Sequence, residues 1–355
     1  MTDKLCLITF SNNADHQNVI YSMYKALKDK VEIFTVGIVN PKSDSATFDD
    51  HNIYCNCPER PGIGKGTFRI HVLISLARRI KKEGITHLYF ESQHLWNAAL
   101  MALCPQCKKI VAVHDVIPHD GNRAMDLSNY VTCHMADHIL LRNQKYKDLL
   151  STRFKIPMEK ISSQELWREF KVFSKPSHNG VMLCFGRIRR YKGFDKLAQI
   201  VEATPDITYR IVGEPDEESM PLVEQLKKYS NVQVIDREVS DQEMDQEFEN
   251  ADWLVLPYTS ATQSGVIVDA FLRSRPVIAF DVGAIAEQVM DGYNGRLVPE
   301  GNVEAFVKAV REAVEMPEEE LITYAKNAHQ FAYERYSAES AASRFLENVS
   351  CYSCV

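Results

Sequence analysis

The sequence lacks any apolar run long enough to cross a membrane. No stretch of about 18 consecutive apolar residues occurs in the chain, and no secretory segment is recognised at its beginning. Its nine cysteines are an odd number, and they are scattered through apolar positions such as Cys6 and Cys184. That distribution favours reduced thiols over a disulfide framework. We therefore expect a cytoplasmic protein that does not span a membrane.

Three motifs of nucleotide-dependent and metal-dependent enzymes are also missing. No Asp-x-Asp pair occurs, which leaves no obvious metal clamp for a diphosphate. No Gly-x-Gly-x-x-Gly follows the first apolar run, which makes a dehydrogenase the least favoured class. The glycine-rich segment 62–67 is not a P-loop, because Glu59 and Gly66 occupy positions that the motif reserves for other residues. We expect neither a metal ion nor a bound cofactor.

Apolar and charged residues occur in the proportions of an ordinary globular protein. The chain is 45% hydrophobic and 25% charged, and its 355 residues provide enough mass for two domains. In the first half, short apolar runs alternate with segments of helical periodicity, which is typical of parallel strands joined by crossover helices. The expected strands are residues 5–10, 31–36, 87–90 and 110–113, and the expected helices include residues 18–27 and 68–82.

The same alternation restarts after a polar, turn-rich connection at residues 162–180. We predict an α/β protein with two Rossmann-like domains, at residues 1–165 and 166–335, each a doubly wound parallel sheet facing a central ligand cleft. A long helix is expected at residues 318–348, and the helix from about 335 to 355 is expected to pack back on the first domain. The expected strands of the second domain are residues 181–184, 209–212, 232–235, 253–256 and 277–279.

The net charge of −7 conceals an uneven distribution. Residues 1–170 hold 22 Lys and Arg against 18 Asp and Glu, whereas residues 171–355 hold 19 against 30. Basic residues gather at 76–82 and at Lys108 and Lys109. A solvated helix face accounts for such a cluster, and so does contact with an anionic surface such as lipid headgroups. Peripheral association with the inner face of a membrane is therefore one expectation.

The segment Phe-Gly-Arg-Ile-Arg-Arg-Tyr-Lys-Gly, residues 185–193, follows an apolar run and precedes a helical pattern. Gly186, Arg187 and Lys192 are therefore expected where a strand passes into a helix. Ligands of parallel α/β sheets bind at the carboxyl ends of strands, and two cations with flanking glycines suit a phosphate group. We expect both cationic side chains to be exposed and to bind a nucleotide diphosphate.

A second small-residue loop, Leu-Pro-Tyr-Thr-Ser-Ala-Thr-Gln-Ser-Gly at residues 256–265, also separates a strand from a helix. Unpaired backbone N–H groups and the helix dipole at such a terminus bind phosphate. Gln263, Ser264 and Gly265 are expected there, followed by Val266. Asp269 falls one turn into the helix, where its carboxylate can accept hydrogen bonds from a ribose diol.

These two motifs, in this order, resemble those of the retaining nucleotide-sugar glycosyltransferases of family four, which have the two-domain GT-B fold. The resemblance covers nearly the whole second half of the chain. It implies that Arg187 and Lys192 hold the donor diphosphate and that Asp269 replaces the glutamate that binds the ribose. Residues 262–266, Thr-Gln-Ser-Gly-Val, resemble a loop found in one branch of the family, in which Gln263 would contact the sugar.

The chain departs from the family pattern at several positions. Ala261 stands where the family has a glutamate that meets the donor sugar, and Ser274 stands where it has a glycine. The usual glycine-rich loop after the first strand is replaced by Ser-Asn-Asn-Ala-Asp at residues 11–15. Residues 113–118, Val-His-Asp-Val-Ile-Pro, resemble the segment whose histidine lies beside the donor sugar. That implies a catalytic role for His114, with a histidine hydrogen-bonded to a loop as the structural alternative.

The resemblance implies a metal-independent hexosyltransferase. It would move a sugar from a nucleotide-diphosphate sugar, its co-substrate, to a glycan or lipid-linked acceptor, with retention at the anomeric carbon. Arg187, Lys192 and the helix terminus would stabilise the departing diphosphate. Surface polysaccharide synthesis is the expected context, and no nucleic-acid partner is expected. Two alternatives stay open: an epimerase or phosphorylase of the same fold, and a nucleotide-sugar-binding subunit without catalysis, which the alanine at 261 favours.

Overall fold

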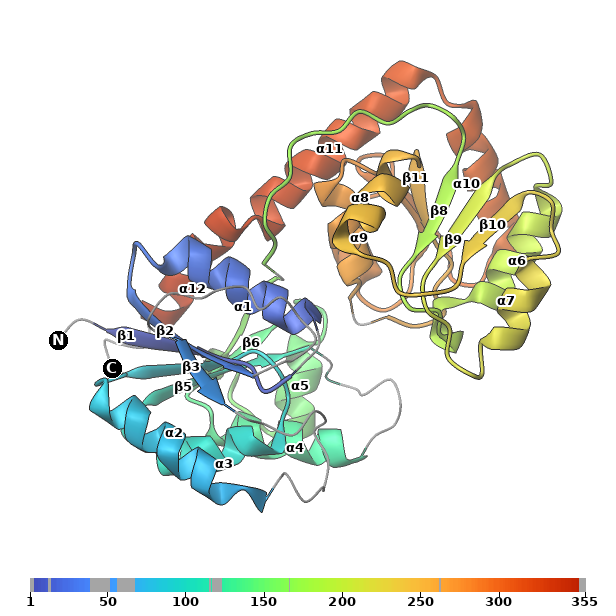
Figure 1. Ribbon diagram of the computed structural model, residues 1–355. Coiled ribbons are helices and arrows are strands. Elements are labelled where there is room, and N and C mark those ends of the chain that lie inside the picture. Colours follow the sequence, from blue (N-terminus) through green and yellow to red (C-terminus); the bar gives the residue numbers. More distant parts are fainter. Residues whose placement is uncertain are drawn as a thin grey trace. The chain divides into compact units, whose positions relative to one another are not determined.

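The computed structural model describes residues 3–11, 14–38, 52–55, 68–114, 116, 123–165, 167–261 and 263–350. The glycine-rich segment 62–67, Asp115 and Thr262 lie outside the described residues. The chain divides into two compact units: unit 1 comprises Met1–Glu169 and Ser337–Val355, and unit 2 comprises Phe170–Tyr336. The observed boundary at residue 169 and the expected one at residue 165 fall in the same connecting segment. Figure 1 shows each unit as a sheet flanked by helices.

Unit 1 is built on a seven-stranded parallel sheet with the order β3-β2-β1-β4-β5-β6-β7. Its strands are β1 (Lys4–Ile8), β2 (Glu32–Ile38), β3 (Asn52–Cys55), β4 (His87–Phe90), β5 (Lys108–Val113), β6 (His138–Leu141) and β7 (Ile161–Ser163). The strand order reverses between β1 and β4. In doubly wound sheets, ligands bind at such a reversal, beyond the carboxyl ends of the strands.

Both faces of this sheet are buried. In β1, Leu5 and Leu7 belong to one cluster of buried side chains, whereas Cys6 and Ile8 belong to another. Strands buried on both faces read as continuous apolar runs rather than alternating ones, which is why the sequence predicts them. The helices of unit 1 are α1 (Ala14–Leu27), α2 (Ile70–Lys82), α3 (Leu95–Leu103), α4 (Arg123–Met135), α5 (Lys147–Phe154) and α12 (Ala338–Ser350).

Unit 2 is built on a six-stranded parallel sheet with the order β10-β9-β8-β11-β12-β13, which reverses between β8 and β11. Trp253, Phe271 and Phe280 are among the large side chains buried in its core. Its strands are β8 (Met182–Phe185), β9 (Tyr209–Val212), β10 (Val232–Ile235), β11 (Trp253–Leu256), β12 (Val277–Phe280) and β13 (Gly295–Val298). Its helices are α6 (Phe194–Ala203), α7 (Met220–Leu226), α8 (Asp241–Glu249), α9 (Gly265–Leu272), α10 (Val303–Glu315) and α11 (Glu318–Tyr336).

The chain returns to unit 1 in its last helix. Ser337 separates α11 from α12 because it pairs with Arg168, whose carbonyl oxygen accepts the first amide of α12 at 3.0 Å. Phe345 of α12 then packs against Tyr89 of β4, with ring centroids 5.5 Å apart. The expectation of one continuous helix over residues 318–348 is therefore wrong, because a backbone pairing with a distant segment interrupts it.

All the expected strands are present, and their ends shift by at most two residues. The sequence does not predict β3, β6, β7 and β13. Three of these lie at sheet edges, where strands are short and carry polar residues that interrupt an apolar run. β7, for example, contains only three residues and lies within the segment expected to be an interdomain connection. The expected interdomain connection therefore begins too early in the sequence.

The described cysteines lie in apolar surroundings. Cys6, Cys104, Cys107, Cys133 and Cys184 are buried and form no disulfide among the described residues. Burial raises the pKa of the Cys133 thiol to about 12. Within the described ranges, none of the helices combines the length and the apolarity that a membrane crossing requires.

His94 gives unit 1 a pH-dependent helix cap. Its Nδ1 accepts the Trp96 amide at 3.0 Å at the start of α3, and burial lowers its pKa from 6.5 to about 4. The unfolded chain binds a proton at His94 that the folded chain does not, so stability falls as pH falls from 6.5 towards 4, by up to about 1.4 kcal/mol per pH unit. His94→Asn keeps a capping oxygen and removes this titration. Its melting temperature should fall less steeply than that of the wild type across this window; equal slopes would contradict the assignment.

Candidate functional site

Two glycines shape the loop that follows β8. Gly186 has a φ of +95° and Gly213, after β9, has a φ of +152°, conformations that favour glycine. A Cβ atom on Gly213 would lie 2.3 Å from the carbonyl oxygen of Gly186, so a side chain there would collide with backbone. The loop leaves the sheet beside the reversal between β8 and β11, where doubly wound sheets bind ligands.

The arginines of this loop differ in their partners. Nε of Arg189 lies 3.4 Å from Oδ2 of Asp216, and Nη1 of Arg190 lies 2.9 Å from Oε1 of Glu218. Arg187 is exposed, and its side chain makes no hydrogen bond or ion pair with the described part of the chain. Its guanidinium is therefore available to an anionic ligand without breaking a contact.

Lys192 is buried rather than exposed, so the expectation for this side chain is wrong. Only 7% of its surface is accessible, and its Nζ lies 5.5 Å from the centroid of the Tyr258 ring. It ends the 3-10 turn Arg190–Lys192, and Gly193 separates it from α6. A cation in a partly desolvated position acts more strongly on a neighbouring anion than one in water. Burial therefore strengthens, rather than weakens, a role in phosphate binding.

Gly193 lies where the loop that follows β8 approaches the end of β11. Its φ is +70°, and a Cβ atom would lie 1.8 Å from the carbonyl oxygen of Pro257. The amide and hydroxyl of Thr259 both donate to the carbonyl oxygen of Tyr191, at 2.8 and 3.1 Å. Backbone contacts thus hold the two motif-bearing loops together.

The second expected motif forms the N-terminus of α9. Ser264 is the N-cap, and the helix begins at Gly265. Oε1 of Gln288 accepts the Ser264 amide at 2.8 Å, and Nε2 of Gln288 donates to the Ser264 carbonyl at 3.1 Å. The amides of the first helical turn have no acceptor within the helix and carry partial positive charge. Gln288 therefore fixes the position of this helix terminus, a role that the sequence does not indicate.

The two motifs meet at Gly186. A Cβ atom on this glycine would lie 3.0 Å from Nζ of Lys192 and 3.1 Å from Cγ2 of Val266. Asp269 stands three residues after Val266, on the same side of α9. Its Oδ1 lies 4.0 Å from Nη1 of Arg273. The structure thus brings Lys192 of the first motif and Val266 of the second to one backbone position.

The two departures from the family pattern in this unit differ in their consequences. Ala261 is 4% exposed, so it offers no polar side chain to a sugar, while Gln263, two residues further on, is half-buried. Ser274 has a φ of +59°, the left-handed conformation that explains a glycine at this position. Its hydroxyl accepts the Ser174 amide at 3.1 Å. The serine therefore keeps the turn, whereas the alanine removes a polar group.

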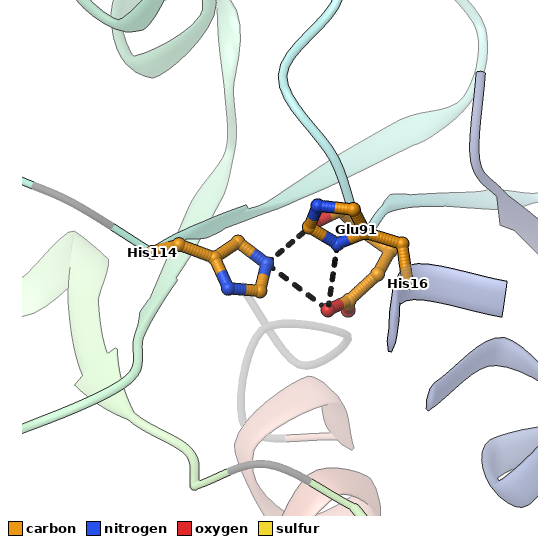
Figure 2. A group of neighbouring side chains, drawn as sticks. All are labelled: His16, Glu91 and His114. Carbon is orange, nitrogen blue, oxygen red and sulfur yellow. Dashed lines mark hydrogen bonds and ion pairs between the residues drawn. The ribbon is translucent and has the colours of Figure 1, made fainter. Parts of the chain in front are cut away.

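In unit 1, His114 belongs to a cluster with Glu91 and His16 (Figure 2). His114 follows β5, Glu91 follows β4, and His16 lies in the first turn of α1, so the cluster lies at the carboxyl edge of the sheet. Nε2 of His114 is 3.1 Å from Oε1 of Glu91 and 2.8 Å from the Glu91 carbonyl oxygen. Nδ1 of His16 is 4.0 Å from the same Oε1. The imidazole rings are almost perpendicular, with centroids 4.8 Å apart.

Glu91 is the buried centre of this cluster. Its side chain is 0% exposed, and its Oε2 accepts hydrogen bonds from Nη2 of Arg142 and from the Tyr89 hydroxyl. Burial opposes ionisation, but the Arg142 guanidinium and the contacts of His114 and His16 hold the pKa of Glu91 well below its usual range. Arg142 also donates to two backbone carbonyls of the segment that follows β7. Glu91 is thus an ionised carboxylate on a fixed support.

The same cluster is a candidate metal site. One donor atom each from His16, Glu91 and His114 lie within 4.8 Å of one another, the one such group among the described residues. A metal–nitrogen bond at Nε2 of His114 would be about 2.0–2.1 Å long. The carbonyl oxygen of Glu91 lies 2.8 Å from that nitrogen, a hydrogen-bond distance, so Nε2 already has a partner in this structure. This geometry favours a hydrogen-bonded network over a metal centre.

The sequence indicates His114 but not its three partners, His16, Glu91 and Arg142. A signal for Glu91 is available, because a carboxylate directly follows the apolar run at 87–90 and so lies at the carboxyl end of a strand. The same signal is available for Arg142, which directly follows the apolar residues 139–141, whereas none marks His16. Their contacts with Glu91 arise only because β1, β4 and β6 belong to one sheet.

Comparison with known proteins identifies a domain within unit 2. Residues 179–316 match the family model described as Glycosyl transferases group 1. This range contains every candidate donor residue of unit 2. No curated protein matches the sequence.

Several solved structures are similar over the whole chain. HepE of Anabaena in complex with UDP-glucose is 16% identical, with a TM-score of 0.74 over 98% of this chain and 99% of HepE. A glycosyltransferase from Rickettsia africae is 14% identical, with a TM-score of 0.75 over 100% of both chains. Sucrose-phosphate synthase from Thermosynechococcus elongatus is 14% identical, with a TM-score of 0.74 over 99% of this chain and 100% of the synthase. The chain therefore has the GT-B fold, and its residues 179–316 match the glycosyltransferase group 1 family.

Proposed function

We propose that this protein is a retaining glycosyltransferase that moves a hexose from a nucleotide-diphosphate sugar to a glycan or lipid-linked acceptor. The observation that carries the proposal is the grouping of Lys192 and the first turn of α9 around Gly186, inside the segment that matches glycosyltransferase group 1. The exposed guanidinium of Arg187 extends from the same loop. Two cations and a helix terminus suit the two phosphates of such a donor.

The main chemical task in this reaction is to stabilise charge on the departing nucleoside diphosphate. Arg187, Lys192 and the amides of the first turn of α9 supply preorganised positive charge for that purpose. The two side-chain cations take the part that a divalent ion plays in other transferases, so the proposed transfer needs no metal. Asp269 accepts hydrogen bonds from the ribose, Gln263 contacts the donor sugar, and the leaving phosphate takes the acceptor proton.

We further propose a role in surface polysaccharide synthesis, with unit 1 resting on an anionic membrane surface. α2 supports this proposal because Leu73, Leu76 and Ile80 are buried while its basic residues, Arg78, Arg79, Lys81 and Lys82, are exposed. Just before the helix, Phe68 is 67% exposed. A basic face with adjoining exposed apolar side chains suits contact with anionic lipid.

A thermal-shift screen tests the donor site. HepE was crystallised with UDP-glucose, so UDP and UDP-sugars are the first compounds to test, followed by GDP, ADP and CMP and their sugars. A ligand at 100 times its dissociation constant should add about 2.7 kcal/mol of stability. Transfer from the stabilising donor should persist in excess EDTA and give a product of unchanged anomeric configuration. No shift with any compound would remove the proposed diphosphate site.

Asp269→Asn is expected to weaken donor binding about tenfold. The ionised carboxylate accepts stronger hydrogen bonds from a ribose diol than a neutral amide does, a difference of about 1.5 kcal/mol. The exposed Asp241, in the first turn of α8, provides the matched control Asp241→Asn. Calorimetric titration with UDP measures both. Equal affinities for the Asp269 variant and the control would mean that the ribose binds elsewhere.

A nucleotide-sugar-binding subunit without catalysis is the second candidate function. The buried Ala261 favours it, because the position at which family members carry a sugar-binding glutamate has no polar side chain. This candidate predicts donor binding in the thermal-shift screen with neither hydrolysis of the donor nor transfer to any acceptor. Hydrolysis or inversion of the donor without an acceptor would instead support the third candidate, a GT-B epimerase.

A further inference from the structure

Arg273 ends α9, four residues after Asp269, the proposed ribose-binding residue. An acidic and a basic side chain at this spacing, with the acid first, form a favourable ion pair on a helix surface. Here the two charged groups lie too far apart to hydrogen-bond. Nη1 of Arg273 is 4.0 Å from Oδ1 of Asp269 and donates instead to the backbone carbonyl oxygen of Asp269, at 3.0 Å. Another group must therefore hold the guanidinium.

That group is Asp245 of α8, the helix beside α9 (Figure 1). Nε and Nη2 of Arg273 both lie 2.7 Å from Oδ1 of Asp245. The Arg273 side chain is 8% exposed, and its guanidinium carbon lies 5.2 Å from the centroid of the Phe248 ring. Within the described part of the chain, the guanidinium thus donates to Asp245 and to the Asp269 backbone, and not to the Asp269 carboxylate.

Lys171 holds Asp245 from the other side. Its Nζ donates to both carboxylate oxygens and lies 2.6 Å from Oδ2. Burial opposes ionisation of Asp245, but Lys171 and Arg273 hold its pKa below its usual value. Asp245 is therefore an ionised carboxylate between two cations. Its side chain is 38% exposed, so its replacement opens no cavity in the core.

We infer that Asp245 is a positioning residue that holds Arg273 away from Asp269, so that the Asp269 carboxylate accepts hydrogen bonds from the donor ribose rather than from the arginine. The inference rests on the proposed function, which assigns the ribose to Asp269. If Arg273 paired directly with Asp269, ribose hydroxyls would have to displace a charge-assisted hydrogen bond, which is stronger than a neutral one. Asp245 removes that competition.

Asp245→Ala tests the inference because it removes the acceptor of two Arg273 N–H groups. A buried charged donor left unpaired is costly, and Oδ1 of Asp269 is already within 4.0 Å of the guanidinium. We expect Arg273 to pair with Asp269 in this variant. Calorimetric titration of the full chain should then give a Kd for UDP about tenfold higher than that of the wild type. In steady-state kinetics KM should rise with little change in kcat, because the ribose contact is equal in the ground and transition states.

Removal of Arg273 should reverse this loss. Arg273→Met keeps an unbranched apolar stem beside Phe248 and carries no charge. We expect both Arg273→Met and the double variant Asp245→Ala/Arg273→Met to bind UDP within about twofold of the wild type, even though the double variant melts at a lower temperature. A double variant that binds as weakly as Asp245→Ala would overturn the inference. So would a tenfold loss in Arg273→Met alone, a test that does not require Asp245→Ala to fold.

A second nucleotide locates the effect at the ribose. 2′,3′-Dideoxy-UDP lacks the two hydroxyl groups that Asp269 is proposed to bind, so the wild type should bind it at least about tenfold more weakly than UDP. We expect Asp245→Ala to leave its Kd within about twofold of the wild-type value. Equal losses for UDP and 2′,3′-dideoxy-UDP would overturn the inference and leave the proposed function intact. A wild type that binds none of UDP, GDP and ADP would remove the proposed function, and the inference with it.

Glu247→Ala is the matched control. Glu247 also lies on α8 and accepts two hydrogen bonds from Arg210 of β9, at 2.6 and 2.7 Å. Its side chain is 10% exposed, so its loss should lower the melting temperature at least as much as the loss of Asp245. We expect its Kd for UDP to stay within about twofold of the wild type. A tenfold rise in this control as well would mean that the stability of α8, not the position of Arg273, determines the affinity.

Discussion

Arg187→Ala is expected to lower kcat for sugar transfer by about 10²- to 10³-fold, the loss typical of removing one preorganised donor to a developing negative charge. The melting temperature should not change. Arg187 is exposed and has no partner in the described part of the chain, so its removal leaves no buried group unpaired. Steady-state kinetics with the donor identified by thermal shift measures the effect.

Arg190→Ala is the matched control for this loss. Arg190 lies three residues further along the same loop, and its side chain is 86% exposed and paired with Glu218. A surface ion pair of this kind contributes at most about 1 kcal/mol to stability. We expect kcat to stay within about twofold of the wild type. Equal losses in Arg187→Ala and Arg190→Ala would mean that the charge of the loop matters but not the position of Arg187.

Lys192→Met extends the same prediction to a buried cation. Methionine retains an unbranched apolar stem, which preserves packing around a side chain that is only 7% exposed. We expect a loss of kcat similar to that of Arg187→Ala, with a small change in melting temperature. Wild-type turnover in both variants would contradict the assignment of the diphosphate site.

Gly193→Ala is expected to destabilise unit 2 and to abolish donor binding. The left-handed φ of +70° by itself costs about 1–2 kcal/mol for an alanine. In addition, the new Cβ atom would lie 1.8 Å from the Pro257 carbonyl oxygen, so the β8 and β11 loops must move apart. Lys192 and Val266 of α9 then no longer both lie close to Gly186. The melting temperature and the thermal shift with UDP measure both consequences.

Gly301→Ala separates the two causes of the stability loss expected in Gly193→Ala, which are backbone strain and the collision with Pro257. Gly301 has nearly the same φ, +69°, but no other group lies within 4 Å of the place that a Cβ atom would take there. It therefore reports the strain of the backbone conformation without a collision. We expect Gly301→Ala to lose about 1–2 kcal/mol and to keep donor binding. Equal stability losses in the two variants would show that the contact with Pro257 relaxes freely.

The candidate donor site could be predicted from the sequence because each of its parts is local. Arg187 follows an apolar strand by two residues, and Ser264 directly precedes a helix, so both are assigned from neighbouring residues alone. Backbone geometry at a strand end or a helix terminus depends on the nearest few residues. Residues 179–316, which match glycosyltransferase group 1, contain both positions.

The exposure of Lys192 could not be predicted in this way. Its position at the end of a 3-10 turn is local, but its burial depends on residues far away in the sequence, such as Tyr258 in the loop that follows β11. A charged side chain such as lysine is expected to be exposed. That expectation is wrong for Lys192, because other residues pack around its side chain. The left-handed Ser274 is the converse case, since its hydroxyl bonds a distant amide and so compensates for a missing glycine.

By itself, the sequence determined the alternation of buried strands and helices in both units, and the two loops in which Arg187 and Ser264 lie. These features follow from apolar periodicity and from residues that are neighbours in the chain. Only the tertiary structure decided three contacts. Gln288 hydrogen-bonds the Ser264 backbone, and Lys192 and Val266 both lie close to Gly186. Glu91 lies beside His16 and His114 and forms an ion pair with Arg142. Those contacts join segments far apart in the sequence, and they form only once the order of the strands in each sheet is fixed.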